Sequence, residues 1–251
     1  MTVAIDLGGK VAVITGGSRG LGREMAQAYA AAGAHVVVAS RKQDACDAAA
    51  AEITESTGVK AVGVAAHVGD WDGCSQLVDA TIDAFGKIDV LINNAGIAPA
   101  YDSIESVTEA LFDKTFDVNL KGPFRLASVA APRMEEGGAI INVSSIASVR
   151  PKESDLVYAA AKAGLNTITK ALAQAYGPRL RVNTIMAGPF LTEISEAWYT
   201  DAWRERARSF PLGRAGRPDE ISGTALYFGS DLSTFTTGTV LAVDGGRTAM
   251  S

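Results

Sequence analysis

The sequence predicts an α/β fold in which about seven parallel strands form one doubly wound sheet with helices on both faces. Seven short apolar runs occur along the chain, longer segments of helical periodicity alternate with them, and a glycine-rich turn follows the first run. The runs lack the polar alternation of half-exposed strands, which is typical of parallel strands covered on both faces. The expected strands are Val11–Ile14, His35–Val38, Ala61–Val64, Val90–Ile92, Ala139–Val143, Arg181–Ile185 and Val240–Val243.

The segments between these strands predict crossover helices. Leu21–Ala32, Asp72–Phe85 and Leu156–Tyr176 are amphipathic and long enough to leave the sheet and return to it. Apart from an alanine-rich helix around residues 48–51, no repeat, linker or low-complexity block interrupts the alternation. We therefore expect a single Rossmann-type domain over residues 1–251.

Residues 188–216 depart from this alternation and predict a lid over a substrate site, because they form a long insertion after the sixth expected strand. The insertion contains Trp198, Tyr199, Trp203 and Phe210. These aromatic side chains either line an apolar substrate pocket, or form the buried side of a helix or a subunit contact.

Composition narrows the possible partners and compartment. The chain is 47% hydrophobic with a net charge of −5, and it has no run of lysine and arginine, so we expect a folded protein that does not bind nucleic acid. It has neither a secretory signal pattern nor an apolar stretch near the roughly 20 residues of a membrane span, so we expect a cytoplasmic protein without membrane association. Cys46 and Cys74 predict reduced thiols, and His35 and His67 stand at no metal-ligand spacing, so no metal site is expected.

The turn after the first strand predicts a phosphate-binding loop. It reads Thr15-Gly16-Gly17-Ser18-Arg19-Gly20-Leu21-Gly22, and a helical pattern begins at its end. Glycines permit the tight turn and let backbone N–H groups approach a pyrophosphate, while the helix N-terminus contributes partial positive charge. The alternative is an ordinary glycine-rich loop.

Here the sequence resembles the short-chain dehydrogenase/reductase family. The resemblance continues in the same order over essentially the whole chain, through Asn93-Asn94-Ala95-Gly96, Asn119, Ser144-Ser145, Tyr158-x-x-x-Lys162 and Val243-Asp244-Gly245-Gly246. It implies an enzyme that moves a hydride between a nicotinamide cofactor and a small alcohol or carbonyl substrate. It also implies a homotetramer, with the helices around Phe116–Met134 and Leu156–Tyr176 between subunits.

The end of the second strand favours NADP(H) over NAD(H). An NAD site usually places a carboxylate there, whereas this chain has Ser40 and Arg41, which can bind a 2′-phosphate. Arg19 in the glycine turn is placed to join them, although either arginine can instead be a solvated surface residue. Where many relatives have an aspartate for the adenine, this chain has His67, which either hydrogen-bonds the base or packs against its neighbours.

Tyr158 and Lys162 predict the proton-transfer centre, since a spacing of four residues puts both side chains on one face of a helix. A phenol has an ordinary pKa of about 10, and we expect the ammonium and an oxidised nicotinamide to lower it. Tyr158 then accepts the alcohol proton or donates it in the reverse direction. Ser145, thirteen residues before Tyr158, resembles the family's serine that binds the substrate oxygen. Asn119 resembles the asparagine that places a water beside the lysine, or is a structural helix residue.

The remaining cofactor contacts follow from the resemblance. Thr192 is expected to bind the nicotinamide carboxamide, although Ala187 stands where the family usually has proline, which leaves that loop less constrained. A structural role and a ligand role both stay open for Asn94. The expected cofactor-binding residues are Gly16, Ser18, Arg19, Gly20, Leu21, Gly22, Ser40, Arg41, His67, Val68, Asn93, Ala95, Gly96, Tyr158, Lys162, Gly188 and Thr192.

The substrate stays open at this level. Arg150 lies between Ser145 and Tyr158 and either reaches the substrate or does not, and Arg204, Arg206 and Arg208 either meet an anionic substrate or lie on a solvated face. Two non-catalytic functions compete with an active enzyme: a regulatory protein that senses redox state by binding NADP(H), and a scaffold that uses the fold for assembly. The full set of catalytic residue types favours the enzyme.

Overall fold

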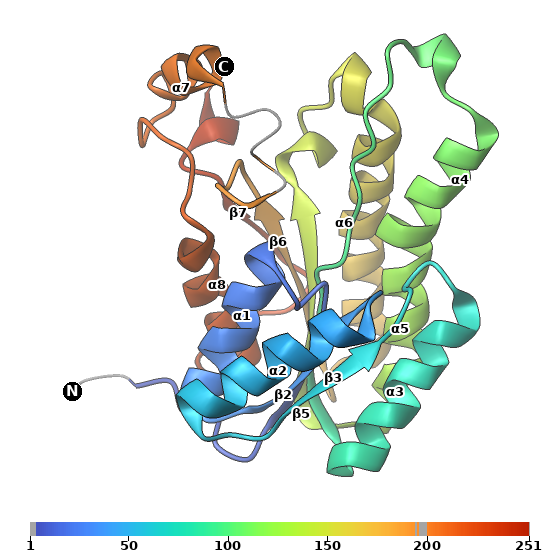
Figure 1. Cartoon of the computed structure of the whole chain (residues 1–251), viewed down its shortest axis with the longest axis vertical. Coiled ribbons are helices and arrows are strands. Elements are labelled where there is room, and N and C mark those ends of the chain that lie inside the picture. The colour runs from blue at the N-terminus through green and yellow to red at the C-terminus, as the bar shows by residue number, and fades with distance from the viewer. Residues whose placement is uncertain (1–3, 194, 196–199, 251) are drawn as a thin grey trace.

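A computed structural model describes residues 4–193, 195 and 200–250. Seven parallel strands form one sheet in the order β3-β2-β1-β4-β5-β6-β7 (Figure 1). The predicted fold class is confirmed. The strands are β1 Val11–Thr15, β2 His35–Ser40, β3 Ala61–Ala65, β4 Ile88–Asn93, β5 Met134–Ser145, β6 Arg181–Ala187 and β7 Val240–Val243.

The order of the strands creates a switch point in the middle of the sheet. From β1 the chain first adds β2 and β3 on one side, and β4 then pairs with the other side of β1. Helices that leave β1 and β4 therefore cover opposite faces, and in sheets of this order ligands bind in the crevice between the two connecting loops at the carboxyl edge. The turn after Thr15 and the loop after Asn93 meet at this crevice.

Helices cover both faces of the sheet, as Figure 1 shows. Burial of apolar side chains on the two faces creates two separate hydrophobic clusters. The helices α1 Gly20–Ala31, α2 Gln43–Thr57 and α8 Ser222–Gly229 contribute to one cluster. The helices α3 Trp71–Phe85, α5 Gly122–Ala130 and α6 Leu156–Tyr176 contribute to the other. The shorter α4 Glu109–Phe116 precedes α5, and α7 Asp201–Ala207 lies in the insertion.

The insertion after β6 lies at the carboxyl edge of the sheet, with α7 near the C-terminus (Figure 1). A parallel bridge between Phe190 and Gly216 closes its base. Phe210 is buried and meets Trp203 edge to face at 5.8 Å between ring centroids, so this pair packs within the insertion. Trp198 and Tyr199 lie outside the described residues. None of the helices in the described ranges has the length and apolar character needed to cross a membrane.

Candidate active site

The register of the strands aligns the candidate residues along the carboxyl edge of the sheet. Ser145, the last residue of β5, pairs with Ala187 of β6, which in turn pairs with Val243 of β7. On the other side of the switch point, Thr15 of β1 pairs with Ala39 of β2. The predicted cofactor turn, the predicted catalytic serine and the start of the insertion therefore share one edge.

Glycine is required at two positions of the turn between β1 and α1. Gly16 has a φ of 67°, and a Cβ there would lie 2.8 Å from Nδ2 of Asn94. A Cβ on Gly22 would lie 2.2 Å from the carbonyl oxygen of Gly16. The backbone of the turn therefore presses closely against α1.

The N-terminus of α1 provides free donors for an anion. Arg19 occupies the N-cap with an extended backbone, and its side chain forms no capping hydrogen bond. The first N–H groups of a helix have no partner within it, and a pyrophosphate can accept from them. The cradle left by the missing Cβ atoms and these open N–H groups fit a dinucleotide pyrophosphate.

Asn94 holds this turn in place, which gives it a structural role, while a ligand role stays a prediction. Its Nδ2 donates to the carbonyl oxygen of Thr15 at 2.9 Å, and its backbone N–H donates to Oγ1 of Thr15 at 3.0 Å. The backbone N–H of Ala95 donates to the same hydroxyl at 3.1 Å. The sequence placed Thr15 in the predicted turn, but its role as the acceptor for the loop after β4 was not predicted. A hydroxyl directly before a glycine turn is the signal that could have indicated it.

The residues predicted to bind the adenosine end differ in exposure. Ser40 is half-buried at the end of β2, and its Oγ lies 3.0 Å from the thiol sulfur of Cys46. Arg41 and His67 are exposed, so the ring of His67 is not packed into the core. Arg19 forms an exposed ion pair with Glu193 of the insertion at 3.6 Å.

Val68 and Asn93, two residues predicted to bind the cofactor, are both buried. Val68 is 8% exposed and Asn93 is 1% exposed. The Nδ2 of Asn93 donates to Oδ1 of Asn142 at 2.9 Å, inside the sheet. The amide nitrogen of Asn93 therefore bonds within the protein, and a contact of this residue with the ribose stays a prediction.

Tyr158 and Lys162 lie one turn apart on α6, and Nζ of Lys162 is 5.7 Å from the centroid of the Tyr158 ring. Nζ donates to the carbonyl oxygen of Val143 at 2.8 Å. Lys162 is only 3% exposed, and burial lowers its pKa to about 8. The protein thus places an amine of reduced basicity behind the phenol.

The pKa of Tyr158 is raised in the protein without cofactor. Burial raises this pKa above its ordinary value, a hydrogen bond with Ser145 lowers it, and the charge of Asp155 raises it further. The expected lowering of this pKa was assigned to the Lys162 ammonium and an oxidised nicotinamide acting together, and it stays a prediction for the cofactor-bound protein. In the protein alone, Ser145 is the group that opposes the effect of burial on the Tyr158 pKa.

Ser144 and Ser145 have different partners. The Oγ of buried Ser144 donates to the carbonyl oxygen of Lys162 at 3.2 Å. Ser145 is half-buried, bonds to Tyr158, and accepts from the backbone N–H of Ala147 at 3.2 Å. Of the two hydroxyls, Ser145 is the one beside the phenol.

Asn119 lies in a π-helical turn, Asp117–Lys121, that joins α4 to α5. Such turns often occur at functional sites. Its Nδ2 donates to the carbonyl oxygens of Ile97 and Thr115 at 2.8 and 2.9 Å, and its Oδ1 accepts from the backbone N–H of Ile97 at 3.2 Å. A Cβ on Gly96 would lie 2.8 Å from that Oδ1 and 3.4 Å from Nζ of Lys162. The absence of a side chain at Gly96 leaves room between the asparagine and the lysine.

Thr192, in the loop after β6, lies beside the glycine turn, because a Cβ on Gly20 would come within 3.6 Å of its side chain. Gly188 packs against Asp244, where a Cβ would lie 2.5 Å from the Asp244 Cα. The backbone N–H of Thr192 donates to Oγ of Ser195 at 3.0 Å. A pocket of about 580 Å³ opens here, and Ser195 and Glu24 in its wall were not predicted from the sequence. Its lining is Gly20, Glu24, Leu191, Thr192, Glu193, Ser195, Arg204 and Pro218.

Known proteins resemble this chain in sequence and in structure. A family model described as enoyl-(acyl carrier protein) reductase matches residues 16–248. L-rhamnose 1-dehydrogenase (NAD(P)(+)) of Azotobacter vinelandii is 39% identical over 246 residues, which cover 94% of this chain and 96% of the relative. Dehydrogenase/reductase SDR family member 4 of Homo sapiens is 35% identical over 251 residues, covering 98% and 90%. The NADPH-dependent 3-quinuclidinone reductase of Rhodotorula rubra superposes with a TM-score of 0.91 at 30% identity, covering 98% of this chain and 94% of that one.

Proposed function

The chain belongs to the short-chain dehydrogenase/reductase family, and on that premise we propose that it is an NADP(H)-dependent oxidoreductase that interconverts an alcohol and a ketone or aldehyde. The observation that carries the proposal is the contact of Tyr158 with Ser145 and its position one helical turn from the buried amine of Lys162. These groups stand beside a turn that fits a dinucleotide pyrophosphate. The family binds nicotinamide cofactors.

In the proposed reaction the protein moves a proton and stabilises charge on the substrate oxygen. The nicotinamide supplies hydride chemistry when bound, and its positive oxidised form would favour the phenolate of Tyr158. Tyr158 accepts the hydroxyl proton of an alcohol, or donates a proton to a carbonyl oxygen in the reverse direction. Ser145 donates a hydrogen bond to the same oxygen as its charge changes. Lys162 binds the nicotinamide ribose from its position behind Tyr158.

Asn119 holds the loop after β4 against the π-helical turn. Its two bonds to Ile97 position Gly96, whose bare Cα leaves the space between Asn119 and Lys162 open. A water in this space would accept from the amine and pass a proton onward. The asparagine is therefore proposed as a positioning residue for the proton route.

The preference for NADP(H) is supported by the end of β2. Arg41 is exposed there and Ser40 is half-buried beside it, so a guanidinium and a hydroxyl are available to a 2′-phosphate. A carboxylate in place of Ser40 would repel that phosphate. One relative depends on NADPH by name, and another uses NAD(P)(+). The combined variant Arg41→Ala with Ser40→Asp should shift the ratio of kcat/KM toward NAD(H).

A spectrophotometric survey of alcohols and carbonyl compounds tests the proposal. Each compound is offered with NADP(H) and with NAD(H), and the absorbance of the reduced nicotinamide reports turnover. Tyr158→Phe should lower kcat by about 10²–10⁴-fold, since it removes the acid and base but keeps the ring. Heat stabilisation by NADP⁺ should persist in this variant and shows that it is folded and binds cofactor. Equal turnover by Tyr158→Phe and the natural chain would refute the proton-transfer role.

We further propose a homotetramer in the cytoplasm. Phe112 and Phe116 stack at 4.5 Å between ring centroids on α4, and Phe112 and Phe124 are each more than 40% exposed. Exposed aromatic side chains on consecutive helices are typical of a subunit contact. Both cysteines are free and buried, the state that a reducing compartment maintains. Light scattering should report about four times the mass of one chain.

A further inference from the structure

Three arginines from distant parts of the chain lie at the carboxyl edge of the sheet, on the side of β5, β6 and β7. The pairing of Ser145 with Ala187, and of Ala187 with Val243, aligns the ends of these strands. Arg150 follows Ser145 in the short connection to α6, and Arg247 follows Val243 in the turn after β7. Both residues therefore lie within a few positions of strand ends that flank the candidate active site.

The third arginine, Arg206, belongs to α7 of the insertion, which is tied to the turn after β7. The guanidinium of Arg247 stacks over the ring of Phe210 at 4.6 Å, and the backbone N–H of Leu212 donates to the carbonyl oxygen of Gly245 at 3.1 Å. Phe210 in turn packs against Trp203 of α7. These contacts hold α7 and the turn after β7 together over the end of the sheet.

The arginines of α7 and of its C-cap, Arg208, fall into two classes. Arg204 pairs with Asp201 and Arg208 pairs with Glu205, both at 2.7 Å. Arg206, between them, forms no ion pair with any carboxylate among the residues that the structure describes, and the same holds for Arg150 and Arg247. Sequence alone could not separate Arg206 from its two neighbours.

The positive charges of Arg206 and Arg150 both act on Arg247. Burial lowers the pKa of Arg247 first, and the positive charges of Arg206 and Arg150 lower it further, while Asp244 opposes them. The carboxylate of Asp244 already accepts from the backbone N–H groups of Gly246 and Thr248 and from the Thr248 hydroxyl. A bound anion would relieve the repulsion between the guanidinium groups and accept hydrogen bonds from them.

We propose that Arg150, Arg206 and Arg247 form an anion-binding rim that holds a carboxylate or phosphate group of the substrate while its alcohol or carbonyl group faces Ser145 and Tyr158. The substrate class is then an anionic hydroxy or oxo compound. This inference rests on the proposed oxidoreductase function. The cofactor's 2′-phosphate is a different anion, because its proposed ligands end β2, four strand positions from β6 and so roughly 19 Å away.

The anion-binding rim is tested by comparing the turnover of oxo acids with that of their uncharged methyl esters. A series of 2-, 3- and 4-oxo acids is assayed with NADPH, each beside its methyl ester, which removes the charge and keeps the carbonyl group. The natural chain should prefer the acids by about tenfold or more in kcat/KM, equivalent to about 1.4 kcal/mol. Arg206→Ala with Arg247→Ala should bring the ratio close to one, mainly through KM for the acid. Arg208→Ala removes a paired arginine at the C-cap of the same helix and should keep the preference.

A second measurement needs no turnover. Succinate should raise the melting temperature of the natural chain above that in sodium chloride of equal ionic strength, and Arg206→Ala with Arg247→Ala should abolish this difference. Arg208→Ala and Arg41→Ala should keep it, which separates the rim from exposed positive charge in general and from the 2′-phosphate site.

The two measurements distinguish failure of the rim from failure of the enzyme assignment. Turnover of neutral carbonyl compounds with no preference for acids and no effect of succinate would overturn the rim and leave the oxidoreductase proposal intact. A succinate effect that depends on Arg206 and Arg247, without turnover of any carbonyl compound, would support an anion site and count against the enzyme. A change in oligomeric mass in the double variant, with an unchanged acid-to-ester ratio, would make the three arginines a subunit contact and the rim wrong.

Discussion

Ser144 and Ser145 are neighbours in the chain, yet the alternation of side chains along β5 sends them to different environments. Ser144 bonds to the carbonyl oxygen of Lys162 in the interior, and Ser145 bonds to the phenol of Tyr158. The hydrogen bond from Ser145 opposes the burial that raises the pKa of Tyr158. Chemistry at this scale therefore depends on which of two identical side chains faces the crevice.

Replacing each serine by alanine should separate catalysis from packing. Ser145→Ala should lower kcat/KM by about 10²-fold or more, because it removes the donor to the substrate oxygen. It should also move the alkaline optimum of alcohol oxidation upward, because the pKa of Tyr158 loses its lowering contact. Ser144→Ala should cost about 1 kcal/mol of stability and leave the pH profile in place. Similar losses of activity in both variants would contradict the assignment of Ser145.

Burial of the Lys162 ammonium lowers the stability of the folded chain. Its pKa is lowered from 10.5 to about 8 by burial, so the folded chain binds this proton less tightly than the unfolded chain does. The penalty, about 3 kcal/mol, is fully present below pH 8. It falls as pH rises from about 8 toward 10.5, because the unfolded state then holds the proton that the folded state has already released.

Lys162→Met should therefore stabilise the protein and inactivate it. At pH 7 the free energy of unfolding in urea should exceed that of the natural chain by about 1–3 kcal/mol, after allowing for the lost bond to Val143. The advantage should shrink between pH 8 and pH 10. An advantage that stays constant over this range would show that the ionisation of Lys162 is not its cause.

At the scale of elements, two helical glycines show how the start of α1 differs from an ordinary helix. Gly22 lies against the carbonyl oxygen of Gly16, where a Cβ would come within 2.2 Å of it. Gly223 lies in α8, and a Cβ there would meet nothing within 4 Å. The first glycine is needed for the close approach of turn and helix, and the second is not.

Gly22→Ala and Gly223→Ala form a matched pair. Gly22→Ala should distort the turn, weaken NADP⁺ binding at least tenfold by calorimetry, and destabilise the chain. Gly223→Ala should bind NADP⁺ as the natural chain does and gain up to about 1 kcal/mol, since alanine is the better helix former. Unchanged binding in Gly22→Ala would argue against the turn as the pyrophosphate site.

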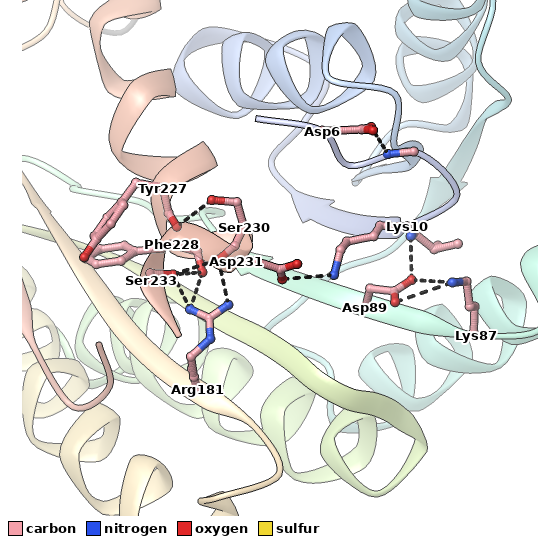
Figure 2. A network of polar contacts seen from close by, with 12 residues as sticks. Asp6, Lys10, Lys87, Asp89, Arg181, Tyr227, Phe228, Ser230, Asp231 and Ser233 are labelled. Atoms are coloured by element: carbon pink, nitrogen blue, oxygen red, sulfur yellow. Dashed lines mark hydrogen bonds and ion pairs between the residues drawn. The ribbon is translucent and has the colours of Figure 1, made fainter. Parts of the chain in front are cut away.

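At the scale of the whole molecule, the edge opposite the crevice carries a network of polar contacts that ties distant segments together (Figure 2). Arg181, at the start of β6, donates to the carbonyl oxygens of Phe228 and Ser230 at 2.7 and 3.3 Å and to the hydroxyl of Ser233. It thereby supplies hydrogen-bond donors to carbonyl groups at the carboxyl end of α8, which have no partner within the helix. The side chain is 8% exposed, so water does not replace these bonds.

Arg181→Met should cost about 2–4 kcal/mol in the free energy of unfolding, because buried carbonyl groups lose a charged donor. The kcat should stay close to that of the natural chain, since Arg181 lies at the amino edge of the sheet and the site lies at the carboxyl edge. Arg217→Met removes an arginine whose ion pairs with Asp219 and Glu220 are exposed, and should cost at most about 1 kcal/mol. A loss of activity in Arg181→Met at full folding would show coupling between the two edges.

The fold and the main features of the site were predictable because their signals are local. Apolar runs such as Val11–Ile14 predict buried strands, the spacing of Tyr158 and Lys162 predicts a shared helix face, and the glycine turn follows its strand directly. Contacts such as Asn94 with Thr15 and Asn119 with Ile97 were not predictable in this way. They join residues 79 and 22 positions apart, and only the packed sheet brings them together.

By itself, the sequence determined the class of fold, the sheet edge at which the candidate catalytic and cofactor-binding residues lie, and the residue types found there. It could do so because hydrophobic periodicity and turn chemistry depend on a few neighbouring residues. The tertiary structure decided the environment of each group. It turned the side chain of Asn93 into the sheet, raised the pKa of Tyr158 in the protein without cofactor, and left Arg206 without an ion pair among the described residues, between two paired arginines. Burial and long-range contacts set these properties, and they exist only once distant segments have packed.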